Sequence, residues 1–176
     1  MISATVRRAV FLDRDGTLIE DVGYPSDPET VRFVDGAVEA LAELRRNGFA
    51  LVVVSNQSGI GRGLITQQEA DAVHERFVDE LRNCGVVLDD IRYCPHAPGE
   101  SCECRKPAPG LLMAAARELA VDLTRSFMVG DSTADVGAGR QAGCRTVVLG
   151  TAADTGADFV AAAWPEAVAH IVSARV

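Results

Sequence analysis

The sequence has few aromatic residues, few basic residues and no long apolar run. Aromatic residues make up 5% of its 176 positions and hydrophobic residues 48%, as in an ordinary α/β protein with a core of Val, Leu and Ala. Because no run of about 20 apolar residues is present, no membrane span is predicted. The 17 Lys and Arg residues against 25 Asp and Glu give a net charge of −8, which argues against nucleic acid or an anionic membrane as a partner.

The N-terminal residues 1–8 do not resemble a secretory signal. Such a signal has a longer apolar region and a cleavage site of small residues. We therefore expect a cytoplasmic protein. In that compartment the five cysteines are expected to be metal ligands or buried thiols before disulfides.

Short apolar runs rich in β-branched residues alternate with segments of helical periodicity. This alternation, with short connections, predicts an α/β fold with a three-layer, doubly wound parallel sheet and helices on both faces. No repeat or linker is visible, so one domain over residues 1–176 is expected. Core elements fill every interval between motifs, which leaves no room for a cap domain. Strands are predicted at 9–12, 49–55, 91–93, 126–129 and 146–149, and helices at 36–47, 66–84, 109–119, 134–141 and 164–174.

Three polar segments follow predicted strands. They are Asp13-Arg14-Asp15, residues 55–59 and Gly130-Asp131. Because parallel strands of such a sheet end at the same edge, where ligands bind, these segments are expected to meet in one site. Asp13 and Asp15 are two residues apart in an extended segment, so both can point into that site. Core packing alone gives no reason for this coincidence.

The carboxylates suggest a divalent cation. Asp135 comes about one helical turn after Asp131 and can return toward the same site. Mg²⁺ is typically held by one or two carboxylates together with substrate phosphate oxygens. Asp131 or Ser132 could instead cap the following helix, but beside Asp13 a shared cation is the better account.

Phosphate-binding groups lie near these carboxylates in the predicted fold. Ser55 ends a buried strand, where its hydroxyl and the following backbone amides can hold a phosphate oxygen. Arg105 and Lys106 precede a helix and offer the cations that carboxylates and phosphates need. The loop around Arg62 contains glycines 59, 61 and 63, which serve either close approach to a ligand or turns alone.

A cysteine-rich loop precedes Arg105. Cys94, His96, Cys102 and Cys104 lie within eleven positions, and a Cys₃His set is one that structural Zn²⁺ takes. A Cys102–Cys104 disulfide and unligated thiols are the alternatives, and the four convergent ligands favour zinc. Outside this loop, buried or semi-buried helix ends are expected for Cys84 and Cys144, and surface positions for His74 and His170.

The motifs occur in an order that resembles the haloacid dehalogenase (HAD) superfamily of phosphatases. The resemblance extends from the first motif to about Gly150. It implies a capless HAD-like fold and a phosphatase that forms an aspartyl-phosphate intermediate. The residues that carry it are Asp13-Arg14-Asp15-Gly16-Thr17, Ser55, Lys106, Gly130-Asp131 and Asp135.

The resemblance also implies roles for these residues. Asp13 is the nucleophile, and Asp15 first protonates the leaving group and then activates water. Mg²⁺ is held by the Asp13 carboxylate, the Asp15 backbone carbonyl and Asp131, with Asp135 supporting the metal.

The transferring phosphoryl group has its own implied ligands. Ser55 and the amide of Asn56 bind it, and Lys106 orients both Asp13 and the phosphate.

The cysteine loop narrows the resemblance to the branch that contains the D-glycero-D-manno-heptose 1,7-bisphosphate 7-phosphatases and the histidinol-phosphate phosphatases. Gly23-Tyr24 and residues 56–63, with Arg62, are similar to the heptose type, in which Arg105 resembles the ligand of the second phosphate. The short interval between His96 and Cys102 is as in the histidinol type and in only some enzymes of the heptose type. A monomeric phosphatase of small phosphorylated sugars is implied. A histidinol-phosphate phosphatase or a zinc-stabilised binding protein without catalysis are the alternatives.

Overall fold

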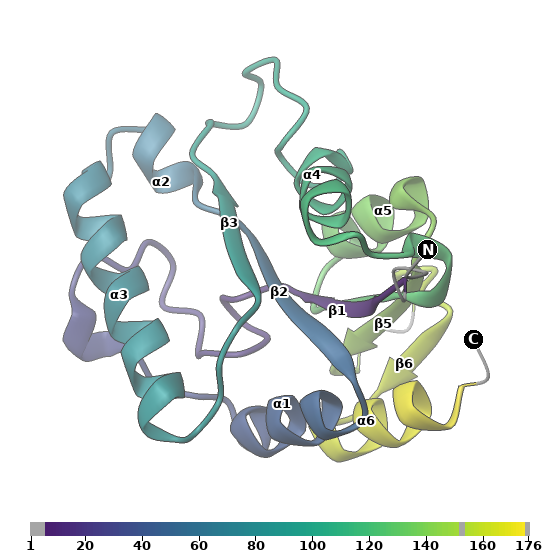
Figure 1. The fold of residues 1–176 in the computed structure, drawn as a ribbon. Helices are drawn as coiled ribbons and strands as arrows, with labels where there is room; N and C mark the ends of the chain where they lie inside the picture. Colours follow the sequence, from purple (N-terminus) through teal and green to yellow (C-terminus); the bar gives the residue numbers. More distant parts are fainter. Residues whose placement is uncertain (1–5, 152–153, 175–176) are drawn as a thin grey trace.

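The structure is a computed structural model that describes residues 6–151 and 154–174. Within this part of the chain, a parallel sheet of six strands runs in the order β3-β2-β1-β4-β5-β6 (Figure 1). The chain therefore winds from β1 outward to β3 and then returns to the other side of β1. The strands are β1 (Arg8–Leu12), β2 (Phe49–Asn56), β3 (Asp90–Cys94), β4 (Phe127–Gly130), β5 (Arg145–Leu149) and β6 (Phe159–Ala161).

Helices cover both faces of the sheet. Helices α1 (Ala37–Arg46), α3 (Gln67–Asn83) and α6 (Trp164–Ser173) pack on one face, and α4 (Gly110–Leu119) and α5 (Thr133–Ala142) on the other (Figure 1). This arrangement confirms the predicted three-layer α/β fold. Short elements add to it: α2 (Ser58–Gly61) and two 3₁₀ turns, Pro28–Thr30 and Leu123–Arg125.

The central strand β1 shows why its sequence is apolar throughout. Val10 and Leu12 pack in one core cluster, while Ala9 and Phe11 pack in the other. A strand buried on both faces has no solvent side, so its sequence does not alternate between apolar and polar residues. When it leaves the core at Asp13, the chain reaches the functional edge of the sheet.

Some sequence-based predictions need correction. Strand β6 was not predicted, because three residues with one exposed member are too short to be recognised without their partner β5. Cys84 is exposed rather than buried or semi-buried, because it follows the last turn of α3. His74 is half-buried and contacts Arg14, so it is not a simple surface residue. No described helix is long and apolar enough to cross a membrane.

The sheet order fixes the place of the site. Strands β1 and β4 are neighbours, although β2 and β3 lie between them in the sequence. The connections after these two strands diverge to opposite sides, which makes the crevice at their carboxyl ends the expected ligand site. Asp13 directly follows β1 and its backbone N–H donates to Val129 O of β4 at 2.9 Å. Asp131 follows β4.

Candidate active site and metal centres

Three carboxylates meet at the carboxyl ends of β1 and β4. One oxygen each from Asp13, Asp131 and Asp135 lies within 4.8 Å of the others. Asp135 is held by a capping box at the start of α5, in which its Oδ2 accepts from Ser132 N at 3.1 Å and Ser132 Oγ at 2.6 Å. Gly16 (φ +82°) approaches Asp131 so closely that a Cβ there would overlap the carboxylate. The arrangement brings together the carboxylates that the sequence predicted.

Lys106 supplies the cation at the floor of this cluster. Its side chain is buried, and its Nζ donates to Asp13 Oδ1 at 2.6 Å, Asp135 Oδ1 at 2.7 Å and Val54 O at 2.8 Å. The side-chain amide of Asn56 holds the backbone of Lys106: its Nδ2 donates to Lys106 O and its Oδ1 accepts from Lys106 N, both at 3.0 Å. Lys106 is thus fixed from both ends.

The cluster holds more negative than positive charge. Burial raises the pKa of Asp13 from 3.8 to about 7, with Lys106 opposing the shift and Asp135 adding to it. Burial and then Asp135 raise the pKa of Asp131. For Lys106, burial is opposed by Asp13 and Asp135, which together raise its pKa. Three carboxylates that lie close together, with one Lys106 ammonium group among them, fit a hard divalent cation such as Mg²⁺.

We expect Mg²⁺ to stabilise the protein more at pH 8 than at pH 6. The pKa of Asp13 is raised in the folded state, so stability is lost as the pH rises from 3.8 through about 7 and this carboxyl ionises in its buried position. At pH 8 a bound cation compensates the charge of the ionised Asp13 and restores this stability. At pH 6 the carboxyl group of Asp13 still holds its proton, which the cation must displace before it binds. Thermal unfolding with and without Mg²⁺ at both pH values measures the effect, with Asp131→Asn as the variant that should lose it. A larger shift in Tm at pH 6 would contradict this assignment.

The carboxyl group of Asp15 lies on the side of Ser55. Its Oδ2 accepts from Gln57 Nε2 at 2.7 Å and from Ser55 Oγ at 3.4 Å, and Arg14 Nη2 lies 3.0 Å away. Gln57 Nε2 also donates to Ser55 Oγ at 2.8 Å. The sequence predicted roles for Asp15 and Ser55 and placed Gln57 in a polar segment near them, but it gave no signal for the hydrogen bonds that Gln57 and Arg14 make to Asp15.

An open cleft of ≈ 360 Å³ lies beside these residues, and Asp15 and Gln57 line it whereas the buried Ser55 and Arg14 do not. Among the described residues that line it, neither Arg62 nor Arg105 is found. Arg62 is exposed, with its guanidinium 5.9 Å from the centre of the Tyr24 ring, and Arg105 Nη1 donates to His96 O at 3.2 Å. Substrate contacts by these two arginines stay predictions. The lining residues are Asp13, Asp15, Asp21, Gly23, Tyr24, Asn56, Gln57, Ser58, Lys106, Ser132, Ala134 and Asp135.

The glycines around Arg62 serve packing and turns. Gly61 N donates to Pro95 O at 2.8 Å, and a Cβ at Gly61 would lie 2.5 Å from Ala97 N. At Gly59 a Cβ would lie 2.7 Å from the Tyr24 ring, and Gly63 has a φ of +68°. The close approach at Gly61 is therefore to the loop after β3, which ties this segment to the cysteine cluster.

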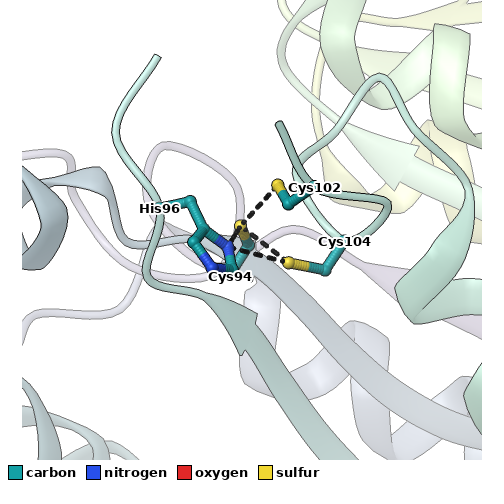
Figure 2. Close-up of side chains that lie close together, drawn as sticks. All are labelled: Cys94, His96, Cys102 and Cys104. Atoms are coloured by element: carbon teal, nitrogen blue, oxygen red, sulfur yellow. Dashed lines mark hydrogen bonds between the residues drawn. The ribbon is translucent and has the colours of Figure 1, made fainter. Parts of the chain in front are cut away.

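The cysteine loop forms a compact cluster of four potential ligands (Figure 2). Cys94 Sγ lies 3.0 Å from Cys104 Sγ, 3.3 Å from His96 Nδ1 and 3.8 Å from Cys102 Sγ. The cysteines are free thiols, and burial, followed by the neighbouring Cys104, raises the pKa of Cys94 to about 12. Three sulfur atoms and one imidazole nitrogen lie close enough to share one cation, and the Cys₃His donor set fits tetrahedral Zn²⁺. The structure shows no disulfide between Cys102 and Cys104.

We expect purified protein to carry about one tightly bound Zn per chain, as a closed four-ligand structural site would. Cys102→Ser should lower the zinc content and the Tm, because it removes one ligand. Cys84→Ser is the matched control, since this exposed thiol lies outside the cluster. Metal analysis after purification measures the content. A zinc-free protein with reactive thiols at Cys94, Cys102 and Cys104 would contradict the zinc site.

The comparisons with known proteins agree with the fold. Residues 103–174 match a family model described as HAD-hydrolase-like, which is the class that the sequence motifs resemble. The D,D-heptose 1,7-bisphosphate phosphatase of B. bronchiseptica, solved with magnesium and phosphate, is 32% identical with a TM-score of 0.85, covering 94% of this chain and 98% of that one. A putative HAD-like phosphatase of Mesorhizobium loti is 37% identical with the same TM-score, covering 94% and 84%.

Curated relatives narrow the class. The D-glycero-beta-D-manno-heptose-1,7-bisphosphate 7-phosphatase of Photorhabdus laumondii is 47% identical over 148 residues, which are 80% of this chain and 79% of the relative. The enzyme of the same name from Escherichia coli K12 is 45% identical over 80% and 78%. The chain belongs to this family of heptose bisphosphate phosphatases. The resemblance seen in the sequence is confirmed.

Proposed function

We propose that the protein hydrolyses the 7-phosphate of D-glycero-β-D-manno-heptose 1,7-bisphosphate. Membership of the phosphatase family supports the substrate. The observation that carries the chemistry is the buried Asp13 carboxylate, held by Lys106 at the floor of an open cleft. The open cleft has room for a small extended sugar. In this proposal the enzyme acts as a monomer in the cytoplasm.

The reaction proceeds in two displacements. Asp13 attacks phosphorus while the bond between phosphorus and the sugar oxygen breaks, and Asp15 gives that oxygen its proton. Asp15 then takes a proton from water, which attacks the aspartyl-phosphate, releases inorganic phosphate and restores Asp13. Lys106 fixes the rotation of the Asp13 carboxylate, so the attacking oxygen starts in a defined place.

The phosphoryl group is bound by polar groups around the cleft. Ser55 and the backbone amide of Asn56 hold its oxygens, and Lys106 neutralises charge. Mg²⁺, when bound, compensates charge on the transferring phosphoryl oxygens. Asp13, Asp131 and the Asp15 carbonyl would hold it, with Asp135 fixing Lys106 beside them.

Structural zinc has a positioning task in this proposal. The cysteine cluster precedes Arg105 and Lys106 directly, and the loop has little regular structure of its own. Arg105 donates to His96 O, and Gly61 donates to Pro95 O. Metal ligation at His96 thus restrains Arg105, which would bind the second phosphate, and the segment that carries Arg62.

A phosphate-release screen tests the proposal. Purified protein with Mg²⁺ is given sugar bisphosphates, sugar monophosphates and histidinol phosphate, and kcat/KM is compared. We expect the β-anomer of heptose 1,7-bisphosphate to give the highest value. A higher kcat/KM for histidinol phosphate would contradict the proposed substrate, and release from none of the compounds would contradict phosphatase activity.

Arg105→Ala should raise KM for the bisphosphate about tenfold or more, because a charged contact to the second phosphate is lost. The kcat should change little, since the reacting phosphate is bound elsewhere. Histidinol phosphate has no second phosphate, so its KM should not change. Arg117→Ala, an exposed arginine of α4, is the control. Equal effects of Arg105→Ala on both substrates would contradict the role of Arg105.

A further inference from the structure

A buried arginine separates the two catalytic aspartates. The Arg14 side chain is 1% exposed, and each of its three guanidinium nitrogens has a partner. Nε and Nη2 face the carboxylate of Asp15 at 3.2 and 3.0 Å, and Nη1 lies 3.3 Å from Nδ1 of His74. The guanidinium group therefore links the loop after β1 to helix α3.

His74 is suited to accept a hydrogen bond from Nη1, the third guanidinium nitrogen of Arg14. Burial, and then the charge of Arg14, lowers the pKa of His74 to about 4, so its ring is neutral at neutral pH. A guanidinium has only donors, so Nδ1 accepts and the ring proton sits on Nε2. The ring packs edge-on to Tyr93 at 5.4 Å between centroids, and the Tyr93 hydroxyl donates to Asp71 Oδ1 at 2.8 Å. Both α3 and β3 therefore hold the histidine.

Arg14 determines how the Asp15 carboxyl group is turned. Gln57 and Ser55 donate to Oδ2 only, which leaves the other oxygen unrestrained by them. Among the described residues, Oδ1 receives its hydrogen bonds from Arg14, through Nη2 at 3.1 Å and Nε at 3.3 Å. A planar fork of this kind restrains both oxygens at once, which a lysine cannot do.

We propose that Arg14, seated by His74, is a positioning residue that orients the Asp15 carboxyl group for proton transfer to the leaving oxygen. The inference rests on the proposed function, in which Asp15 is the general acid. Without His74, a buried N–H of Arg14 loses its acceptor, and the guanidinium must turn to recover one. The fork on Asp15 then turns with it.

Substrates with different leaving groups distinguish a role of Arg14 in positioning Asp15 from a general effect on the structure. A sugar oxygen needs a proton as it leaves, whereas the phenolate of p-nitrophenyl phosphate does not. The ratio kcat/KM includes only the steps up to the first irreversible one, here formation of the aspartyl-phosphate. A misplaced Asp15 therefore lowers kcat/KM for an alkyl phosphate and spares the aryl phosphate.

The experiment compares His74→Leu, which removes the acceptor, with His74→Asn, whose side-chain oxygen can lie near the position of Nδ1. The substrates are p-nitrophenyl phosphate and whichever alkyl phosphate the screen shows to be turned over best. For the alkyl phosphate, we expect His74→Leu to lower kcat/KM on the order of ten- to a hundredfold. For the aryl phosphate it should stay within about twofold, and His74→Asn should restore most of the loss. His170→Asn, on α6, is the matched control.

The outcomes are distinct. Equal losses on both substrates, or an unchanged alkyl phosphate rate, would overturn the positioning role. If His74→Leu does not fold, Arg14→Lys decides, because it keeps the charge, loses the fork and should show the same difference between substrates. A wild-type protein that hydrolyses no phosphate ester would overturn the proposed function, and the inference with it.

Discussion

Asp13→Asn should reduce phosphate release on the order of 10⁴-fold or more, because an amide cannot replace a carboxylate as the nucleophile. The substitution nearly preserves shape, and Lys106 keeps its contact with Asp135. It removes a carboxyl group whose pKa burial has raised to about 7, so no loss of stability is expected at pH 8. Loss of activity with an unchanged Tm would place the defect in the chemistry.

The measurement uses steady-state phosphate release together with thermal unfolding of the same preparations. Asp79→Asn is the matched control, because Asp79 is an exposed residue of α3 that pairs with Arg82 at 3.2 Å. Its rate should equal that of the wild type. Residual activity of Asp13→Asn above about one hundredth of wild type would show that another group can attack phosphorus.

Lys106→Met should damage both stability and catalysis. It removes the one ammonium group between two buried carboxylates, and breaking a buried pair of this kind costs about 3–5 kcal/mol. Activity should fall on the order of 10³-fold, because Asp13 loses its orientation and the phosphate loses a cation. The effects are measured by denaturant unfolding and by phosphate release with saturating Mg²⁺.

The stability loss should depend on pH in a definite direction. Without Lys106, the pKa of Asp13 is raised further above its unfolded value, so the folded state loses stability as the pH increases. The deficit of Lys106→Met relative to wild type should be larger at pH 8 than at pH 5.5, where the carboxyl groups can take up protons. Lys106→Arg, which keeps the charge, should retain more stability than Lys106→Met. A deficit that is equal at both pH values would exclude the carboxylates as its cause.

The predicted elements were those with strong local patterns. The apolar runs of β1 and β2 and the helical periodicity of α3 were visible in the sequence, and the structure confirms these elements. Strand β6 was missed because its identity depends on pairing with β5 rather than on its own three residues. Local pattern therefore gives the fold class but not the edge of the sheet.

The site residues likewise include some that the sequence predicted and some that it did not. Asp13 and Asp131 were predicted because parallel strands end at one edge, so their convergence follows from topology. The burial of Arg14 was not visible, because its partner His74 is 60 residues away on a helix that carries no motif. A charged residue between two aspartates gives no sign of facing inward. Contacts of this kind need the packed structure.

The burial of Lys106 has a practical consequence, because this residue is the only lysine in the sequence. Its amine is protonated, hydrogen-bonded to Asp13, Asp135 and Val54 O, and closed off from solvent. An amine-directed label is therefore excluded from Lys106 while the site is folded. Label found on this side chain by mass spectrometry reports that the floor of the active site has opened, without any measurement of activity.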